Sequence, residues 1–297
     1  MFYFAIFYIA RLSISSLISF ILSYIADVKG IGKVMKIVLL SFPLLSLLSL
    51  FHYTLLFLYI LTVFFEVIFT SYSILKYSLV PKISAKLDEL NSAYELSYAI
   101  SMILGPLLSL ALLRFKVLLL LSVLPLILFI FIDKNIDYIH RRSKKVFKIE
   151  INWVFISYLL VAVAGSIVNL TLVNVAEKIG LFLVDFSLIN ALLGLGSAIS
   201  SVIVSMRKSV ARSEVFLSSV VMSLYPLVIL LCYTDLAYAY LFLAFSVLNG
   251  FFNSIFSIFI TSKIQRQTEY TSTTFSLLFL LSNLISIPVL YIQGMFF

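Results

Sequence analysis

Long apolar runs separated by short polar segments make up most of this sequence. Ten runs have about 18 to 25 residues each, and at about 1.5 Å per residue a helix of that length crosses a hydrocarbon core of about 30 Å. The pattern predicts an all-α polytopic membrane protein with ten transmembrane helices. The runs cover residues 3–25, 34–51, 54–75, 91–113, 115–132, 151–174, 181–205, 213–233, 236–260 and 273–297.

Polar residues are distributed among these runs with a period of three. The second, fifth and eighth runs carry no Asn, Gln, Asp, Glu or basic residue at mid-span, whereas each of the others carries at least one. A polar group inside a bilayer must face protein or a water-filled cavity, so we expect every third helix to be peripheral and surrounded by lipid. The mid-span polar residues are Arg11, Glu66, Glu95, Asn169, Asn190, Asn249, Asn253 and Asn283.

Composition and charge support a membrane protein and give its orientation. Apolar residues make up 63% of the chain, charged residues 11%, and the mean hydropathy is +1.17. When successive loops are assigned to alternate sides, one side holds only Arg114, Lys116 and Lys178, and nearly all other basic residues fall on the opposite side. The positive-inside rule makes the basic side cytoplasmic and predicts a multi-pass cell-membrane protein with both termini outside. The net charge of +8 is thus topological and does not indicate a nucleic-acid partner.

The sequence offers little for an enzyme or a metal site. Cys232 is the single cysteine, and His52 and His140 lie far apart, so neither a disulfide framework nor a metal-ligand cluster is expected. No Asp-rich motif at a span end and no Ser–His pair favours catalysis, and no cofactor is predicted. The first run lacks a basic leader and a small-residue cleavage site, so we expect it to be a retained span.

The longest polar interruption, residues 133–150, divides the chain into two five-helix bundles, 1–132 and 151–297. We interpret it as a basic cytoplasmic linker, with a lipid-headgroup or partner site as the alternative. An internal repeat with an offset of 183 residues maps Pro43 onto Pro226 and Glu66 onto Asn249. One span precedes the first basic loop in the first half, but two precede its equivalent in the second half. Two six-helix repeats would therefore each lack one helix, at opposite ends of the chain, and the bundles should be pseudo-symmetric.

Two six-helix repeats with every third helix peripheral resemble the major facilitator superfamily, and two short motifs strengthen the resemblance. That family carries a G-x-x-x-D-x-x-G-x-basic loop motif, which SYIADVKGIGK resembles at Asp27 and Gly30, with Ser23 in place of the first glycine and Lys33 one position beyond the motif's basic residue. Its exporters carry Gly-Pro-x-x-Gly-Gly in the fifth helix, which ILGPLLSL matches at Gly105 and Pro106. The segment LVPKISAKLDELNSAYEL is also similar to the entry of that helix in prokaryotic efflux members. By this comparison the chain lacks the family's first and last helices.

The resemblance gives these motif residues expected roles. The motif aspartate should meet the start of the last helix, near residues 271–274, and help to hold the outward-open state; a simple interfacial position beside Lys29 and Lys33 is the alternative for Asp27. Gly105 and Pro106 would permit a kink and close helix approach, either as an antiport determinant or as a purely structural kink.

Charged and amide groups at mid-span are candidate coupling or cavity residues. Proton coupling requires a carboxyl group that can take up and release a proton, and Glu66 is the candidate, with a structural hydrogen bond as the alternative. Arg11 must pair or snorkel, and Glu66 and Glu95 are its candidate partners. The resemblance places Asn169, Asn249 and Asn253 along the cavity, whereas interhelical hydrogen bonding is the alternative role.

The expected function is secondary active transport: proton-coupled export of a small, weakly polar or amphipathic solute by alternating access. The bilayer, a small-molecule substrate and H⁺ are the expected partners. Two alternatives stay open, namely a ten-span carrier of the drug/metabolite transporter type and a truncated, non-transporting membrane fragment.

Overall fold

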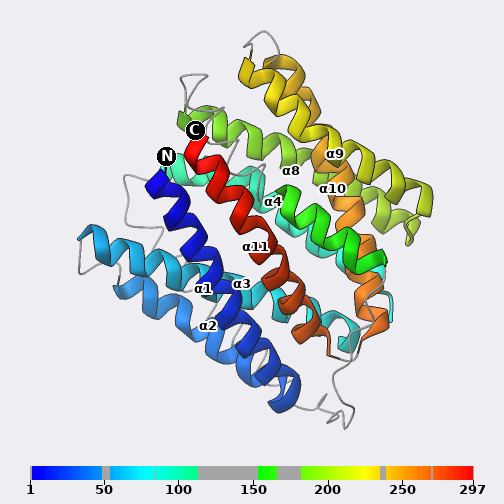
Figure 1. Ribbon diagram of the computed structural model, residues 1–297. Helices are drawn as coiled ribbons and strands as arrows, with labels where there is room; N and C mark the ends of the chain where they lie inside the picture. The colour runs from blue at the N-terminus through cyan, green and yellow to red at the C-terminus, as the bar shows by residue number, and fades with distance from the viewer. Residues whose placement is uncertain are drawn as a thin grey trace. The chain divides into compact units, whose positions relative to one another are not determined.

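The computed structural model describes residues 2–48, 54–83, 85–112, 153–165, 182–234, 239–268 and 270–296, and every regular element in these ranges is a helix (Figure 1). A shorter apolar helix, Trp153–Gly165, accompanies eight long ones. The long helices are α1 (Phe2–Lys29), α2 (Ile31–Leu48), α3 (Leu55–Ile83), α4 (Leu87–Leu112), α8 (Phe182–Arg207), α9 (Arg212–Thr234), α10 (Ala239–Gln267) and α11 (Thr271–Phe296).

Six of the described helices are long and apolar enough to cross a membrane: α1, α3, α8, α9, α10 and α11. The chain is therefore a helical, multi-pass, membrane-embedded protein. The predicted span 115–132, the linker 133–150 and part of the span 151–174 lie outside the described residues.

Four helices extend beyond the ends of the apolar runs that predict them. The last turns of α1, α3, α8 and α10 contain Lys29, Lys82, Arg207 and Arg266, respectively. A cation in the last turn interacts favourably with the helix dipole, and its long side chain can extend toward water. Helical hydrogen bonding thus continues into residues that an apolar-run criterion excludes, and the sequence-based ends were too early here.

The described helices group into two compact units. One contains α1, α2, α3 and α11; the other contains α4, most of the helix Trp153–Gly165, α8, α9 and α10. Each unit thus combines helices from both halves of the chain. The division into bundles 1–132 and 151–297 stays a prediction.

In the first unit, α1 is the central helix. It packs against α11 and α3, and α2 lies against α3 and α1; Figure 1 shows α1 and α11 side by side. Ser19 and Ser71, both fully buried, join α1 to α3 through a 3.0 Å hydrogen bond between their hydroxyl groups. The outer face of α2 exposes Ile37 and Leu44, as expected for a peripheral helix that faces lipid.

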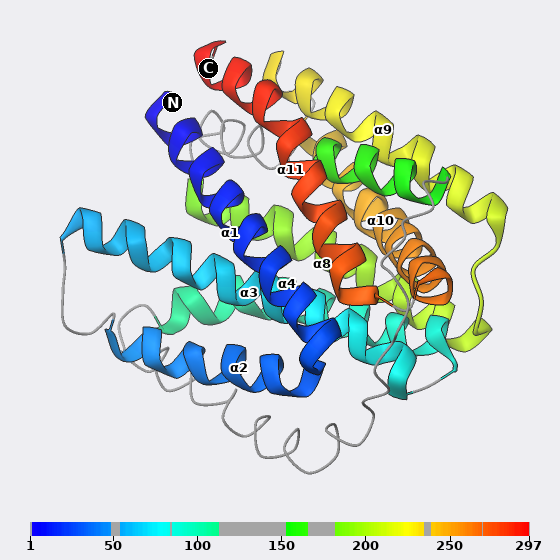
Figure 2. The ribbon, with the colours of Figure 1, turned by 60° about the horizontal axis from the view of Figure 1, so that its bottom comes forward.

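In the second unit, α8 and α10 approach each other closely. A Cβ atom at Gly196 would collide with the carbonyl oxygen of Val247, and one at Gly250 would collide with that of Leu193. The Ser197 hydroxyl donates to the Gly250 carbonyl at 2.9 Å. Small residues let membrane helices pack backbone to backbone, so the glycines set the spacing of this pair. Figure 2 shows α9 beside α10, where Tyr225 stacks on Phe242 with ring centroids 5.9 Å apart.

The two halves share a succession of helices. The lengths of α1 to α4 are 28, 18, 29 and 26 residues, and those of α8 to α11 are 26, 23, 29 and 26. Ser201 and Ser254 join α8 to α10 by a 3.0 Å hydrogen bond, as Ser19 and Ser71 join α1 to α3. The 183-residue offset maps Ser71 onto Ser254 and brings Ser19 within one residue of Ser201. This agreement supports the repeat register.

Candidate functional site: a polar-lined pocket in the second unit

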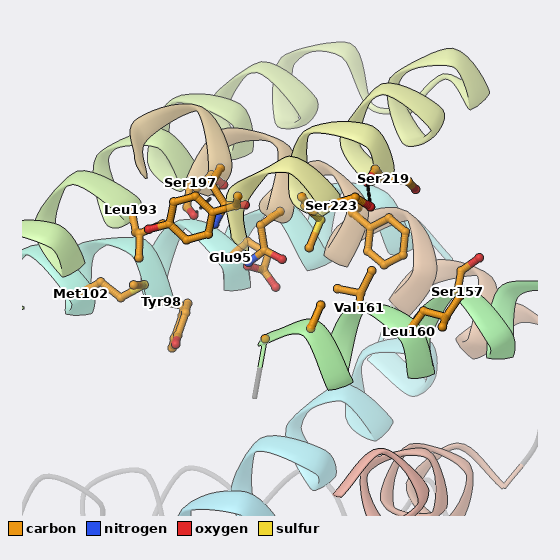
Figure 3. A pocket seen from close by; sticks show the side chains of 18 of the residues that line it. Glu95, Tyr98, Met102, Ser157, Leu160, Val161, Leu193, Ser197, Ser219 and Ser223 are labelled. Carbon is orange, nitrogen blue, oxygen red and sulfur yellow. Dashed lines mark hydrogen bonds between the residues drawn. The ribbon is translucent and has the colours of Figure 1, made fainter. Parts of the chain in front are cut away.

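The second unit contains a pocket of about 420 Å³ (Figure 3). Five helices contribute to it: α4, the helix Trp153–Gly165, α8, α9 and α10. Its lining consists of Glu95, Tyr98, Met102, Ser157, Leu160, Val161, Ala164, Gly165, Asn190, Leu193, Ser197, Ser219, Met222, Ser223, Tyr225, Asn249, Gly250, Asn253 and Phe256.

Helical periodicity explains why these residues meet. On α4 the lining residues Glu95, Tyr98 and Met102 are spaced by three and four positions. The same spacing recurs on α8 at 190, 193 and 197, and on the helix Trp153–Gly165 at 157, 161 and 164. Residues three and four positions apart share one face of a helix, so each helix presents a single face to the pocket.

Glu95 supplies the carboxylate of the lining. It is 8% exposed, and the Ser257 hydroxyl of α10 donates to its Oε1 at 2.7 Å. In Figure 3 the Glu95 side chain points into the space among the labelled lining residues. Among the described residues that line the pocket there is no Lys, Arg or His, and Glu95 is the one with an ionisable carboxyl group.

The remaining polar groups of the lining are neutral. They are the amides of Asn190, Asn249 and Asn253 and the hydroxyl groups of serines and tyrosines, and they alternate with methionine, leucine and phenylalanine side chains. Small-molecule sites typically combine a mostly apolar wall with a few polar groups that fix ligand orientation, in volumes of about 300 to 1,000 Å³. The pocket therefore has the size and chemistry to bind an amphipathic small molecule.

Polar contacts between α4 and α10 continue from the pocket to the ends of these helices. Beyond the Glu95–Ser257 contact, Asn91 Nδ2 donates to Ser262 Oγ at 2.9 Å and to Gln265 Oε1 at 2.7 Å. At the helix ends, Arg266 Nη2 lies 3.2 Å from Asp88 Oδ1. Asn91 and Gln265 are buried, at 1% and 5% exposed. These contacts, which we call the α4–α10 seam, hold the start of α4 against the end of α10.

The structure brings only some of the predicted site residues together. Glu95, Asn249 and Asn253 line the pocket, as the cavity hypothesis expects, whereas Asn169 lies outside the described residues. Tyr98 and Ser197 were not predicted. Tyr98 lies three positions after Glu95, and Ser197 lies seven positions after Asn190, so each shares a helical face with a polar residue that the sequence singled out. Helical spacing from a predicted polar residue was the signal that could have found them.

Arg11 and Glu66 belong to the first unit and not to the pocket. Arg11 Nε lies 3.9 Å from Glu66 Oε2, with the two side chains 25% and 26% exposed. The Arg11 guanidinium also lies 5.0 Å from the ring centroid of Tyr8, within cation–π range. Of the two carboxylates considered as partners of Arg11, Glu66 is the one in contact.

Asp27 contacts the start of α11, also within the first unit. Its Oδ2 accepts hydrogen bonds from the Thr273 backbone N–H at 2.8 Å and from the Thr273 hydroxyl at 2.7 Å. Free N–H groups and the helix dipole make a helix N-terminus favourable for an anion. The expected contact near residues 271–274 is confirmed. Three residues later Gly30 has φ 117°, a conformation that favours glycine, and it ends α1 while Lys33 lies exposed on α2.

Gly105 does not show the expected close approach. α4 continues through Gly105 and Pro106 to Leu112, and a Cβ atom added at Gly105 would meet none of the described residues within 4 Å. In the described structure this glycine therefore creates no tight helix contact, unlike Gly196 and Gly250.

No protein-family model and no curated protein matches this sequence. The described ranges hold no group of three or more His, Cys, Asp or Glu residues placed to bind a metal ion.

Proposed function

We propose that this protein is a secondary active transporter of the cell membrane that exports a small amphipathic solute by alternating access, coupled to H⁺. The observation that carries the proposal is the pocket formed partly by the membrane-spanning helices α8, α9 and α10, whose described lining combines one carboxylate and three amides with several apolar side chains. Transporters bind substrate among helices at membrane depth, where polar groups are costly unless they serve such a site.

The α4–α10 seam supports an alternating-access interpretation. By the charge tally, the ends of α4 and α10 near Lys86 and Arg266 are cytoplasmic. Seam contacts at Asn91 and Asp88 then lie between the pocket and the cytoplasm. In this proposal the seam closes the cytoplasmic path in one state, and its separation opens that path in the other.

Major facilitator membership is the proposed family, with ten spans in two pseudo-symmetric bundles. The Asp27–Thr273 contact supports it, because it forms where the loop motif requires. The matching serine pairs support the register in which each half lacks one helix of a six-helix repeat. A ten-span drug/metabolite carrier is the second candidate within transport, and the same pocket would serve it.

Coupling is assigned to Glu66, whose 3.9 Å separation from Arg11 makes a loose ion pair. Protonation of Glu66 would release Arg11, and deprotonation would restore the pair, so the two protonation states favour different arrangements of α1 and α3. Binding of a proton to Glu66 would in this way be linked to a movement of α1 relative to α3.

Transport in proteoliposomes tests the proposal. Vesicles with an acidic interior should accumulate either ethidium or the neutral probe chloramphenicol above the level of protein-free vesicles. Glu66→Gln should abolish this gradient-driven accumulation and leave downhill exchange measurable, because an amide keeps hydrogen bonding but cannot cycle a proton. Glu89→Gln, at a carboxylate in the first turn of α4 outside the pocket, is the matched control and should behave as wild type.

Gradient-driven accumulation at the wild-type rate in Glu66→Gln would remove Glu66 from coupling. If the folded wild-type protein moves neither probe, the non-transporting alternative is favoured over export of this solute class.

A further inference from the structure

A groove in the first unit differs in chemistry from the pocket described above. It has a volume of about 400 Å³ and is formed by α1, α2 and α3. Its lining includes Leu22, Ile37, Leu44, Leu48 and Phe64. We call it the α2 groove, because most of the residues that form it belong to that helix.

The α2 groove is apolar and lies at membrane depth. Among the described residues that line it, Ser41 is the one with a polar side chain, and its hydroxyl donates to the Ile37 carbonyl of its own helix at 2.8 Å. The lining residues Ile37, Leu44 and Phe64 are exposed. Because α1 and α3 are long and apolar enough to cross a membrane, these exposed side chains face the hydrocarbon core. The groove therefore suits a hydrocarbon chain and not a polar ligand.

Along α2 the groove has the length of one lipid leaflet. Ile37, Ser41, Leu44 and Leu48 are spaced by four, three and four positions, so they lie on one face of the helix. From Ile37 to Leu48 the helix rises by about 16 Å, and half of a hydrocarbon core of about 30 Å is about 15 Å. The groove thus matches one acyl chain that extends from the membrane interface toward the centre of the bilayer.

One end of the α2 groove carries two lysines. Lys33 precedes Ile37 by four positions on α2, and Lys29 follows Leu22 by seven positions on α1, so both share a helix face with groove residues. Gly30 alone separates the end of α1 from the start of α2, which keeps the two lysines at one turn. Both lysines are exposed. The site therefore combines a cationic end with an apolar body.

We infer that the α2 groove binds an anionic phospholipid, with one acyl chain along the groove and the headgroup phosphate at Lys29 and Lys33. Ammonium groups donate charge-assisted hydrogen bonds to phosphate oxygens, and lysines beside a membrane span attract anionic lipids. By the charge tally this end of the groove is cytoplasmic, the side on which anionic lipids are concentrated. The neighbouring carboxylate of Asp27 is directed to α11, where it accepts hydrogen bonds from Thr273. The inference goes beyond the proposed function, because it assigns a second site whose ligand is not transported.

Charge also disfavours a second copy of the chain as the occupant. Copies in one membrane share one orientation, so a symmetric pair that met through α2 would bring the lysines of both copies to the same end. Like charges placed together repel each other, whereas a phosphate group neutralises them. The lysines therefore favour an anionic lipid over self-association.

Titration with lipids that differ only in their headgroup tests the inference. The delipidated full-length protein in a neutral detergent is mixed with phosphatidylglycerol or phosphatidylcholine of identical acyl chains, and bound lipids are counted by native mass spectrometry. The first phosphatidylglycerol should bind about fivefold or more tightly than the first phosphatidylcholine. Lys29→Gln combined with Lys33→Gln should reduce this preference to within about twofold. Lys208→Gln combined with Arg212→Gln, at exposed basic residues between α8 and α9, is the matched control and should keep the wild-type preference.

The apolar part of the site is tested by a variant and by a labelled lipid. Ser41→Phe fills the groove without changing its charge and should weaken binding of both lipids by about fivefold. Ser97→Phe, at an exposed serine of α4 outside the groove, is its control and should bind as wild type. Size-exclusion profiles establish that each variant is folded. In the wild-type protein, phosphatidylglycerol with a photoreactive group near the end of one acyl chain should label residues 37–48 or 64–68, a result that depends on no variant.

Equal affinity for the two lipids in wild type, or labelling confined to other helices, would overturn the inference. A loss of preference as large in the Lys208 and Arg212 control as in the Lys29 and Lys33 variant would do the same. Competition by glycerol 1-phosphate would show a site for phosphate alone, and a dimer that excludes the lipid would place a second copy on the groove; either result would contradict a lipid site. Because binding is measured without flux, each outcome holds whether or not the protein transports a solute.

Discussion

The 183-residue offset pairs α1 and α3 with α8 and α10, yet the contacts within these two helix pairs differ. Both pairs are joined by a hydrogen bond between buried serines. Between α1 and α3 the mid-span polar residues are Arg11 and Glu66, which face each other as an ion pair. Between α8 and α10 glycines bring the backbones together, and Asn249, which the 183-residue offset pairs with Glu66, lines the pocket.

This difference suggests that the two helix pairs have different roles. The charged groups of Arg11 and Glu66 lie 3.9 Å apart, beyond hydrogen-bonding distance, so this pair can break and re-form more easily than a close contact as a helix moves. A close glycine contact is rigid, because any separation loses both packing and the Ser197 hydrogen bond to Gly250. Rigid packing suits a binding site that must keep its shape, whereas a loose pair suits a coupling element.

The largest expected effect is on the close contact between α8 and α10. Gly250→Ala places a methyl group against the Leu193 carbonyl, so α8 and α10 must separate and the pocket lining shifts. We expect a loss of about 1 to 3 kcal/mol of stability, seen as a lower thermal unfolding temperature in detergent. Gly105→Ala is the matched control, because its methyl group meets none of the described residues within 4 Å and alanine favours the helix.

Comparison with Gly105→Ala shows whether the loss of stability comes from the helix contact and not from adding a methyl group to a helix. If Gly250→Ala is as stable as wild type, the two helices are not held by backbone contact, and the proposed contrast in rigidity fails.

A smaller effect is expected for the ion pair. Arg11→Met and Glu66→Gln, made singly and together, form a double-mutant cycle on thermal stability. Because the two charged groups are 3.9 Å apart, beyond hydrogen-bonding distance, we expect a coupling energy of only about 1 kcal/mol. A coupling above about 3 kcal/mol would indicate a tight structural pair and would contradict the role assigned to Glu66 in a mobile element.

The comparison also shows what sequence patterns could predict. Polar residues in apolar helices are costly, so Glu66, Glu95, Asn249 and Asn253 stood out, and the last three lie in the pocket. Tyr98 did not stand out, because tyrosines are common here and can face lipid, core or cavity. The contact between Asp27 and Thr273 was expected from the family resemblance that the loop motif carries. It joins the end of α1 to the start of α11.

The polar and apolar pattern of the sequence could not predict which helices pack together. Helix α11 belongs to the compact unit of α1 to α3, and α4 to that of α8 to α10. Periodicity shows which face of a helix is polar, but it does not say which other helix covers that face. The α4–α10 seam, for example, depends on Asn91 and Gln265, which are 174 positions apart and have no local signal in common.

The smallest expected effect concerns the feature that both pairs share. Ser71→Ala removes the hydrogen bond between α1 and α3, and Ser254→Ala removes that between α8 and α10. Side-chain hydrogen bonds between membrane helices contribute on average about 0.6 kcal/mol, so each variant should lower stability by roughly that amount. If the serines are equivalent members of a repeat, the two losses should agree within the error of thermal unfolding. Ser97→Ala, at an exposed serine of α4 that bonds its own helix, should change stability little and sets the baseline. If only Ser254→Ala lowers stability, the serine hydrogen bond contributes only where the helices are already in close contact. The glycine contact between α8 and α10, and not a property shared by both repeats, would then explain why this helix pair is rigid.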